Sequence, residues 1–288
     1  MDEDLYASDI FHRMTAFDRS GTACAVLVAH HKEILRILDR LSVFRAFIRL
    51  AEMDSDIPYE LYAFSRICDL LVLDLPLEVP VRVDVPTWYL GVSLEQRAQL
   101  MESWGLDRVT QTTFHPFYHE IVQVTQSDHA DEPISLVSEL WPCFMFGDLM
   151  LTRAGVHVRG GIQHINKPMA EASTLYFTFC RSNRHAADLS HGWGSNSQWR
   201  TLFRRDYRMK DGYRYHADGQ YQVLCDRSTW PYYKENPWLT ASLRCEVLRH
   251  RCYVSQWFAD ENAYYPSCYS DTYFEPFLSA ATTTGSPE

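Results

Sequence analysis

Several patterns that identify common classes of protein are missing from this chain of 288 residues. Its eight cysteines include no CxxC pair, so the ligand spacing of a zinc ribbon is absent. No run of 18 apolar residues occurs, and the acidic start at residues 1–4 lacks the basic and apolar regions of a secretory signal. These absences predict a cytoplasmic protein without a membrane-spanning helix, whose thiols are reduced and mostly buried.

Motifs that identify several enzyme classes are also missing. The chain contains no Walker A sequence, no G-x-S-x-G elbow and no kinase motif set. Gly192 and Gly194 are not followed by the third glycine of a dinucleotide fingerprint. The absence of these motifs removes those enzyme classes without selecting another, and it leaves any cofactor unassigned.

The composition describes an acidic globular protein. Lysine and arginine number 27 against 37 aspartates and glutamates, which gives a formal net charge of −10. This charge argues against general nucleic-acid binding, although a local basic stripe could still bind a small anion. Hydrophobic residues make up 46% of the chain and aromatic residues 14%, which predicts an ordered protein with a large core.

Hydrophobic periodicity predicts an α+β fold. Helical N- and C-terminal regions should pack on a mostly antiparallel central sheet, because three- and four-residue spacing gives way to alternation in the middle of the chain. The change of pattern divides the chain into a mainly helical region, 1–106, and a mixed region of sheet and helix, 107–288. No Gly/Ser-rich or Pro-rich connector occurs there, so we expect a seam within one globular unit.

Individual elements follow from the same patterns. Ser93 and Gln96 form a capping box, and Gly105 suits the end of the helix that it begins. Ala154-Gly155 is the expected turn of a hairpin. The expected helices cover residues 5–18, 23–48, 59–73, 93–104 and 238–258, and the expected strands cover 118–126, the hairpin 149–159, 175–180 and two strands within 212–224.

The densest local signal lies between residues 190 and 208. Ser195 and Gln198 have the spacing of a capping box, which predicts a helix that begins near Ser195. On such a helix, one arc would carry the apolar residues and another would carry Arg200, Arg204 and Arg208 at intervals of four. Asp206 falls within the apolar arc, where a carboxylate must be paired or hydrogen-bonded.

This stretch motivates our first functional hypothesis, a small-molecule enzyme with a pocket built around residues 191–206. The helix N-terminus and the arginines would hold a polar or anionic substrate. His119 or His191 would transfer protons, and Asp206 would be either a tuned acid or a structural ion-pair partner. The predicted substrate-binding residues are Trp193, Ser195, Asn196, Gln198, Arg200 and Arg204. A purely structural alternative remains, in which the glycines form a turn and the arginines pair with acids.

Two other functional classes stay open. A non-enzymatic module could bind a protein partner through exposed tryptophan, tyrosine and arginine, which are favoured at interface hot spots. A non-haem metal enzyme could use the H-x-D spacing, which occurs at residues 129–131 and again at 216–218. The second match runs into an Asp-Gly turn, which gives its aspartate a structural explanation.

Overall fold

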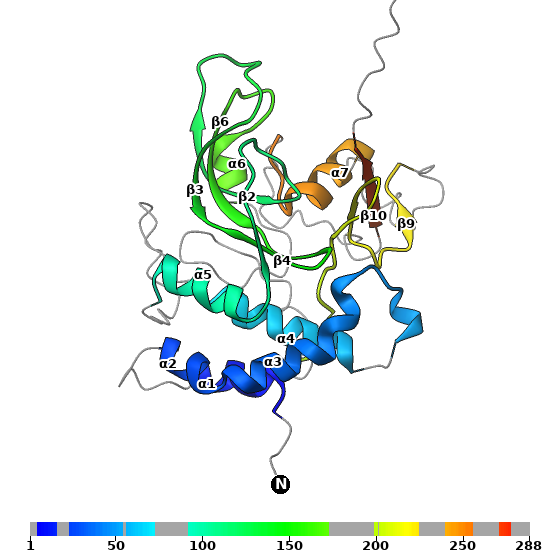
Figure 1. The fold of residues 1–288 in the computed structure, drawn as a ribbon. Helices are drawn as coiled ribbons and strands as arrows, with labels where there is room; N and C mark the ends of the chain where they lie inside the picture. Colours follow the sequence, from blue (N-terminus) through cyan, green and yellow to red (C-terminus); the bar gives the residue numbers. More distant parts are fainter. Residues whose placement is uncertain are drawn as a thin grey trace, which may run out of the picture.

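The chain forms helices and two β-sheets, which confirms the predicted α+β fold. The computed structural model describes residues 5–15, 23–53, 56–72, 92–172, 199–200, 202–224, 240–255 and 271–277. In Figure 1 the helices of the first hundred residues gather on one side, and the sheets and the last helix lie on the other. None of the helices in these ranges is long and apolar enough to cross a membrane.

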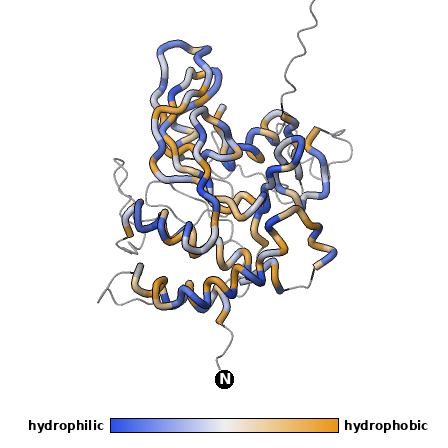
Figure 2. The backbone as a smooth tube through the Cα atoms, in the orientation of Figure 1, coloured by the Kyte–Doolittle hydropathy of each residue, from blue (hydrophilic) through white to orange (hydrophobic). Residues whose placement is uncertain are grey.

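α1 and α3 are amphipathic, whereas α4 is buried along most of its length. α3 buries Ile34, Ile37 and Leu38, and Figure 2 shows hydrophobic and hydrophilic residues alternating along these helices. The single helix expected over 23–48 is broken at His30, because the ψ of that residue is 18° rather than the helical value of about −42°. The helical elements here are α1 (Ala7–Thr15), α2 (Ala23–Ala29), α3 (His31–Arg40), η1 (Leu41–Arg45), η2 (Leu50–Glu52), α4 (Ile57–Leu70) and α5 (Leu94–Ser103).

The predicted capping box at the start of α5 is confirmed. The Gln96 backbone N–H donates to Ser93 Oγ at 3.2 Å, and the Ser93 backbone N–H donates to Gln96 Oε1 at 2.9 Å. Gly105 has a φ of 73°, which glycine adopts without steric cost as the chain leaves the helix. α5 therefore begins where local chemistry predicts, and it is one wall of a surface groove described below.

Two sheets follow α5. The larger has the order β1-β4-β5-β7-β8-β10-β9, with every pair antiparallel except β10 and β9. The smaller has the order β2-β6-β3, in which β2 and β6 are parallel. The strands are β1 (Asp107–Val109), β2 (His119–Gln126), β3 (Ser135–Trp141), β4 (Cys143–Phe146), β5 (Leu149–Thr152), β6 (Ala154–Gly160), β7 (Tyr207–Arg208), β8 (Gly212–Tyr215), β9 (Tyr221–Gln222) and β10 (Asp271–Pro276), and the short helix α6 (Lys167–Ala172) follows β6.

The hairpin expected over 149–159 is wrong. β5 belongs to the larger sheet and β6 to the smaller one, so Arg153 lies at the junction between them. Gly155 is a strand residue rather than a turn residue, and a Cβ there would lie 2.2 Å from Trp141 Cε2. The hairpin is instead β4–β5, and Gly147 with a φ of 63° lies in its turn.

The C-terminal third differs from its expected form. Two strands do occur within 212–224, but β8 and β9 flank β10, a strand that the sequence pattern did not predict. α7 (Ala241–His250) is shorter than the helix expected over 238–258. Thr240 caps its N-terminus, and Arg251 ends it in a left-handed conformation with a φ of 58°. The expected strand over 175–180 lies outside the described residues.

β4 separates the two main cores. Phe144 and Phe146 pack with the N-terminal helices, whereas Cys143 and Met145 pack with β6 and α7. Successive side chains of a strand point to opposite faces, so an unbroken apolar run suits a strand that is covered on both sides. The chain is thus layered, with helices on one side of the larger sheet and the smaller sheet with α7 on the other.

Candidate functional site

The predicted site residues divide into two groups. His191, Trp193, Ser195, Asn196 and Gln198 lie outside the described residues. The structure describes the other four, which are His119, Arg200, Arg204 and Asp206.

The helix predicted to run from Ser195 through Arg208 is wrong where the structure describes it. Residues 202–206 have no regular secondary structure, and 207–208 form β7. Neighbouring strand residues take up the backbone groups: Met150 N–H donates to Asp206 O at 2.8 Å, and Arg208 N–H donates to Asp148 O at 2.9 Å. These sheet hydrogen bonds override the helical spacing of the apolar side chains.

The predicted arginine stripe is correspondingly absent. Arg200 is exposed, Arg204 is buried, and Arg208 pairs with Asp148 at the surface. Trp199 packs against the N-terminal helices, and its Nε1–H donates to His12 Nε2 at 3.1 Å. Arg200 therefore follows directly after a residue that packs on the N-terminal helices. It is not among the partners of Asp206.

Asp206 is completely buried and surrounded by arginines. Arg153 Nη2 lies 3.0 Å from Asp206 Oδ2, Arg251 Nη2 lies 3.2 Å from the same oxygen, and Arg204 Nε lies 3.2 Å from Oδ1. The His216 backbone N–H also donates to Oδ1 at 2.8 Å. We call these four side chains, Asp206, Arg153, Arg204 and Arg251, the Asp206 centre.

Asp206 is ionised near neutral pH. Burial alone would raise its pKa, but Arg204, Arg251, Arg153 and the His216 N–H together hold that pKa well below the ordinary value. A carboxyl group that stays ionised does not exchange protons near neutral pH. The geometry therefore favours the ion-pair interpretation of Asp206 over the tuned-acid interpretation.

The Asp206 centre carries three guanidiniums and one carboxylate. Arg153 is fully buried, and its pKa is lowered to about 10 by burial and by the charge of Arg251. The Nε–H groups of Arg153 and Arg251 are buried and have no hydrogen-bond partner among the described residues. Buried donors are almost always paired, so these two N–H groups can donate to an acceptor atom of a ligand.

The end of α7 helps to build the centre. Arg153 Nη1 donates to Arg249 O at 2.6 Å, and Arg204 Nη2 donates to Leu248 O. The last carbonyls of a helix lack intrahelical donors and carry partial negative charge, so they suit guanidinium groups. Arg251 reaches Asp206 from the residue that ends the helix. The sequence analysis did not predict Arg153 or Arg251 as site residues.

His119 lies close to this centre. It is buried, and its Nδ1 accepts a hydrogen bond from the His115 backbone N–H at 2.9 Å, so the neutral ring carries its proton on Nε2. Burial, followed by the charges of His115 and Arg153, lowers the pKa of His119 to about 4. The ring of Phe114 stacks on both His119 and His250, with centroid distances of 5.7 and 5.9 Å. His119 is thus a neutral donor near neutral pH rather than a ready proton acceptor.

The H-x-D pairs do not assemble a metal site in the described part of the chain. His129 and Asp131 are exposed in a loop between strands. His216 Nδ1 lies 2.7 Å from Asp271 O, and Asp218 Oδ2 accepts from Arg205 Nε at 2.8 Å. No group of three His, Cys, Asp or Glu side chains in the described ranges could hold a metal ion.

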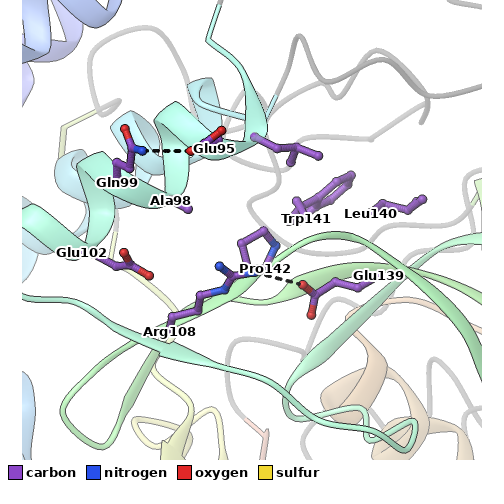
Figure 3. Close-up of a pocket in the computed structure, with 10 residues that line it drawn as sticks. Glu95, Ala98, Gln99, Glu102, Arg108, Glu139, Leu140, Trp141 and Pro142 are labelled. Atoms are coloured by element: carbon purple, nitrogen blue, oxygen red, sulfur yellow. Dashed lines mark hydrogen bonds and ion pairs between the residues drawn. The ribbon is translucent and has the colours of Figure 1, made fainter.

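A second polar site is a surface groove between α5 and the strands β1 and β3. It has a volume of about 440 Å³, and its charged lining residues are Glu95, Glu102, Arg108 and Glu139. Figure 3 shows the α5 side chains along one wall, with Arg108, Glu139 and Trp141 along the other. The sequence analysis did not predict this groove, because β3 is more than 30 residues from α5 in the chain.

Comparison with protein-family models, curated proteins and solved structures found no match to this chain. The functional argument therefore depends on the residues described above.

Proposed function

We propose that the protein binds a small molecule bearing a phosphate or carboxylate group, which the arginines of the Asp206 centre hold. The carrying observation concerns Arg153 and Arg251, which share Asp206 Oδ2 and whose buried Nε–H groups have no hydrogen-bond partner among the described residues. Leaving buried donors without an acceptor is costly, and an anion would offset that cost by accepting hydrogen bonds from these two Nε–H groups.

Asp206 has a positioning role in this proposal. Its two oxygens hold the three guanidiniums, and the carbonyl of Arg249 fixes a further donor of Arg153. Arginines whose orientation is already fixed lose little conformational entropy when an anion binds. Trp193, Ser195, Asn196, Gln198 and His191 lie outside the described ranges and remain predicted contacts of the anionic ligand.

A small-molecule enzyme acting on an anionic substrate is the second candidate function. It is favoured by His119, a buried neutral imidazole near Arg153 whose free ring position carries a proton. Such a group can donate a hydrogen bond that stabilises an oxygen as it gains negative charge during a reaction. This role replaces the proton-accepting role predicted from the sequence.

The interaction-module alternative has less support in the described residues. Trp104 and Trp141 are buried, and Trp199 is half-buried against the helices. That alternative was based on exposed tryptophan, tyrosine and arginine together, and the other tryptophans lie outside the described residues.

Anion binding is tested by thermal unfolding of the full chain in increasing phosphate, with chloride replacing phosphate at constant ionic strength. We expect a saturable rise in Tm, because a ligand that binds only the folded state stabilises it. Arg251→Lys keeps the charge but loses the planar fork, so it should weaken phosphate binding roughly ten- to hundredfold, as expected for the loss of about 1.5–3 kcal/mol.

Arg244→Lys is the matched control. The Arg244 side chain is 2% exposed against 13% for Arg251, and it pairs with Asp271 at 3.0 Å outside the Asp206 centre. Its substitution should lower Tm without changing phosphate affinity. A Tm that does not respond saturably to phosphate, sulfate or citrate would contradict the proposal.

A further inference from the structure

The groove between α5 and β3 is independent of the Asp206 centre and has a different chemistry. We call it the α5 groove, and the argument uses six of its lining residues: Leu94, Glu95, Glu102, Arg108, Glu139 and Trp141. Its volume of about 440 Å³ lies within the range of about 300–1,000 Å³ that is common for small-molecule sites.

The charge in the α5 groove is mainly negative. Three carboxylates face one guanidinium, and Glu139 Oε1 lies 4.0 Å from Arg108 Nη2. The Arg108 side chain is 47% exposed, so this distant pair is largely screened by water. Partial burial raises the pKa of Glu139 even though Arg108 and Arg97 act in the opposite direction. The groove thus contains three carboxylates whose charge is incompletely balanced by one exposed guanidinium.

The apolar part of the groove is rigid. Trp141 Nε1–H donates to Arg153 O at 3.1 Å, and its indole ring lies directly against Gly155. Leu94 is 41% exposed and offers apolar surface at the beginning of α5. Figure 3 shows Trp141 and Glu139 on the wall that faces α5. Trp141 is only 1% exposed, so a ligand here would contact the apolar surface of Leu94 together with the carboxylates.

We propose that the α5 groove binds an organic cation, in which an amine or guanidinium group contacts Glu139 and Glu102 while an apolar body packs near Leu94 and Trp141. The charge complements the carboxylates of the groove, and the net charge of −10 on the whole chain favours the approach of cations. The body of the ligand accounts for a volume that a bare ammonium ion would not fill.

Two observations argue against a metal ion or an extended peptide in the α5 groove. A metal ion is disfavoured because Arg108 lies among the carboxylates, and the described residues bring no three metal-ligating side chains together. An extended peptide added to the edge of β3 is disfavoured because the register of that strand shifts twice, after Leu136 and after Glu139. Such bulges interrupt the regular row of edge hydrogen bonds that strand addition needs.

Calorimetric titration of the full chain at low ionic strength tests the proposal with phenethylamine and agmatine as probes. Neutral 2-phenylethanol and anionic 3-phenylpropionate are the matched controls for charge. We expect both amines to bind at least tenfold more tightly than either control, and we expect added salt to weaken them.

Variants locate the site. Glu139→Gln and Glu102→Gln should each weaken amine binding about tenfold, whereas Arg108→Gln should strengthen it because a competing positive charge is removed. Glu52→Gln removes an exposed carboxylate elsewhere and should leave the affinity unchanged. Arg251→Lys should also leave it unchanged, which separates this proposal from phosphate binding at the Asp206 centre.

The proposal is overturned if neither amine binds at millimolar concentration or if 2-phenylethanol binds as tightly as phenethylamine. It is also overturned if Arg108→Gln weakens amine binding. Glu102 and Arg108 are both exposed, so these tests do not depend on the folding of the Glu139 variant alone.

Discussion

Arg153 Nη2 and Asp206 Oδ2 lie 3.0 Å apart, and both side chains are completely inaccessible to solvent. The pair joins residues 53 positions apart in the chain, at the junction of β5 with β6 and at the entry to β7. The two sheets and the end of α7 meet at this pair, since the Arg153 guanidinium also binds the Arg249 carbonyl. Its integrity should therefore affect both stability and any anion site.

Asp206→Asn should be strongly destabilising. The change preserves the shape of the side chain but removes the negative charge that the buried Arg153 and Arg204 and the partly buried Arg251 contact. Removing one partner of a buried ion pair costs about 3–5 kcal/mol, which equilibrium unfolding in urea would measure. Asp148→Asn is the control, because Asp148 pairs with Arg208 at the surface and its loss should cost at most about 1 kcal/mol. Equal losses for the two variants would show that the centre contributes no special stability.

Stability should fall as the pH decreases from about 6.5 to about 4. Burial, together with nearby positive charges, lowers the pKa of His119 to about 4 and that of His250 to about 3. Because these folded-state pKa values lie below the ordinary value of about 6.5, the unfolded chain binds protons more readily over this range. Each ring should contribute a slope of up to about 1.4 kcal/mol per pH unit, measured by urea unfolding at several pH values.

His119→Asn isolates one of these rings, since its Oδ1 can take the place of Nδ1 as the acceptor for the His115 N–H. The variant should show a shallower decline with acid than the native chain, whereas His129→Asn, at an exposed loop position, should not. Asp271 acts in the opposite direction: burial raises its pKa to about 6, so its contribution to stability diminishes as the pH rises from its ordinary value of about 4 through 6. An unchanged slope in His119→Asn would contradict the assignment of the decline to that ring.

Gly155→Ala should be poorly tolerated for a steric reason. A Cβ at this strand position would lie 2.2 Å from Cε2 of the buried Trp141 ring. Overpacking of a rigid core costs about 1–3 kcal/mol or more, and thermal or urea unfolding would measure it. The same substitution in a Trp141→Leu background should cost much less, because the obstructing ring is gone. Additive losses in the double variant would contradict this account.

Local chemistry made part of this fold predictable. The capping box at Ser93 depends on four consecutive residues, and the alternation over 119–126 marks a strand by itself. Cys143–Phe146 is a short unbroken apolar run, whose periodicity cannot distinguish a strand from a buried helix. β10 lies between β8 and β9 although it is far from both of them in the sequence, so its place in the sheet depends on long-range pairing.

The candidate site was harder to predict, for the same physical reason. The charge on Asp206 was recognised as needing a partner, but the partners come from the β5–β6 junction and from the end of α7. The helical spacing of residues 199–207 suggested that Arg200 and Arg204 were equivalent. Backbone pairing of Asp206 with Met150 and of Arg208 with Asp148 gives a strand in place of the helix, and Arg200 is exposed while Arg204 is buried. Long-range hydrogen bonds of this kind leave no local signal in the sequence.

Arg200→Ala and Arg204→Ala distinguish an anion site at the Asp206 centre from one at residues 191–200. Arg200 is exposed, so its loss should change stability by less than about 0.5 kcal/mol. Arg204 is buried and donates to Leu248 O, so its loss leaves an unpaired carbonyl worth about 1–3 kcal/mol as well as an emptied volume. If the Asp206 centre holds the anion, phosphate affinity should be unchanged in Arg200→Ala, and the remaining folded Arg204→Ala should bind phosphate more weakly. Unfolding curves and phosphate titrations on the same preparations measure both quantities. A folded Arg200→Ala protein that has lost phosphate binding would return the site to the 191–200 stretch and contradict its assignment to Arg153 and Arg251.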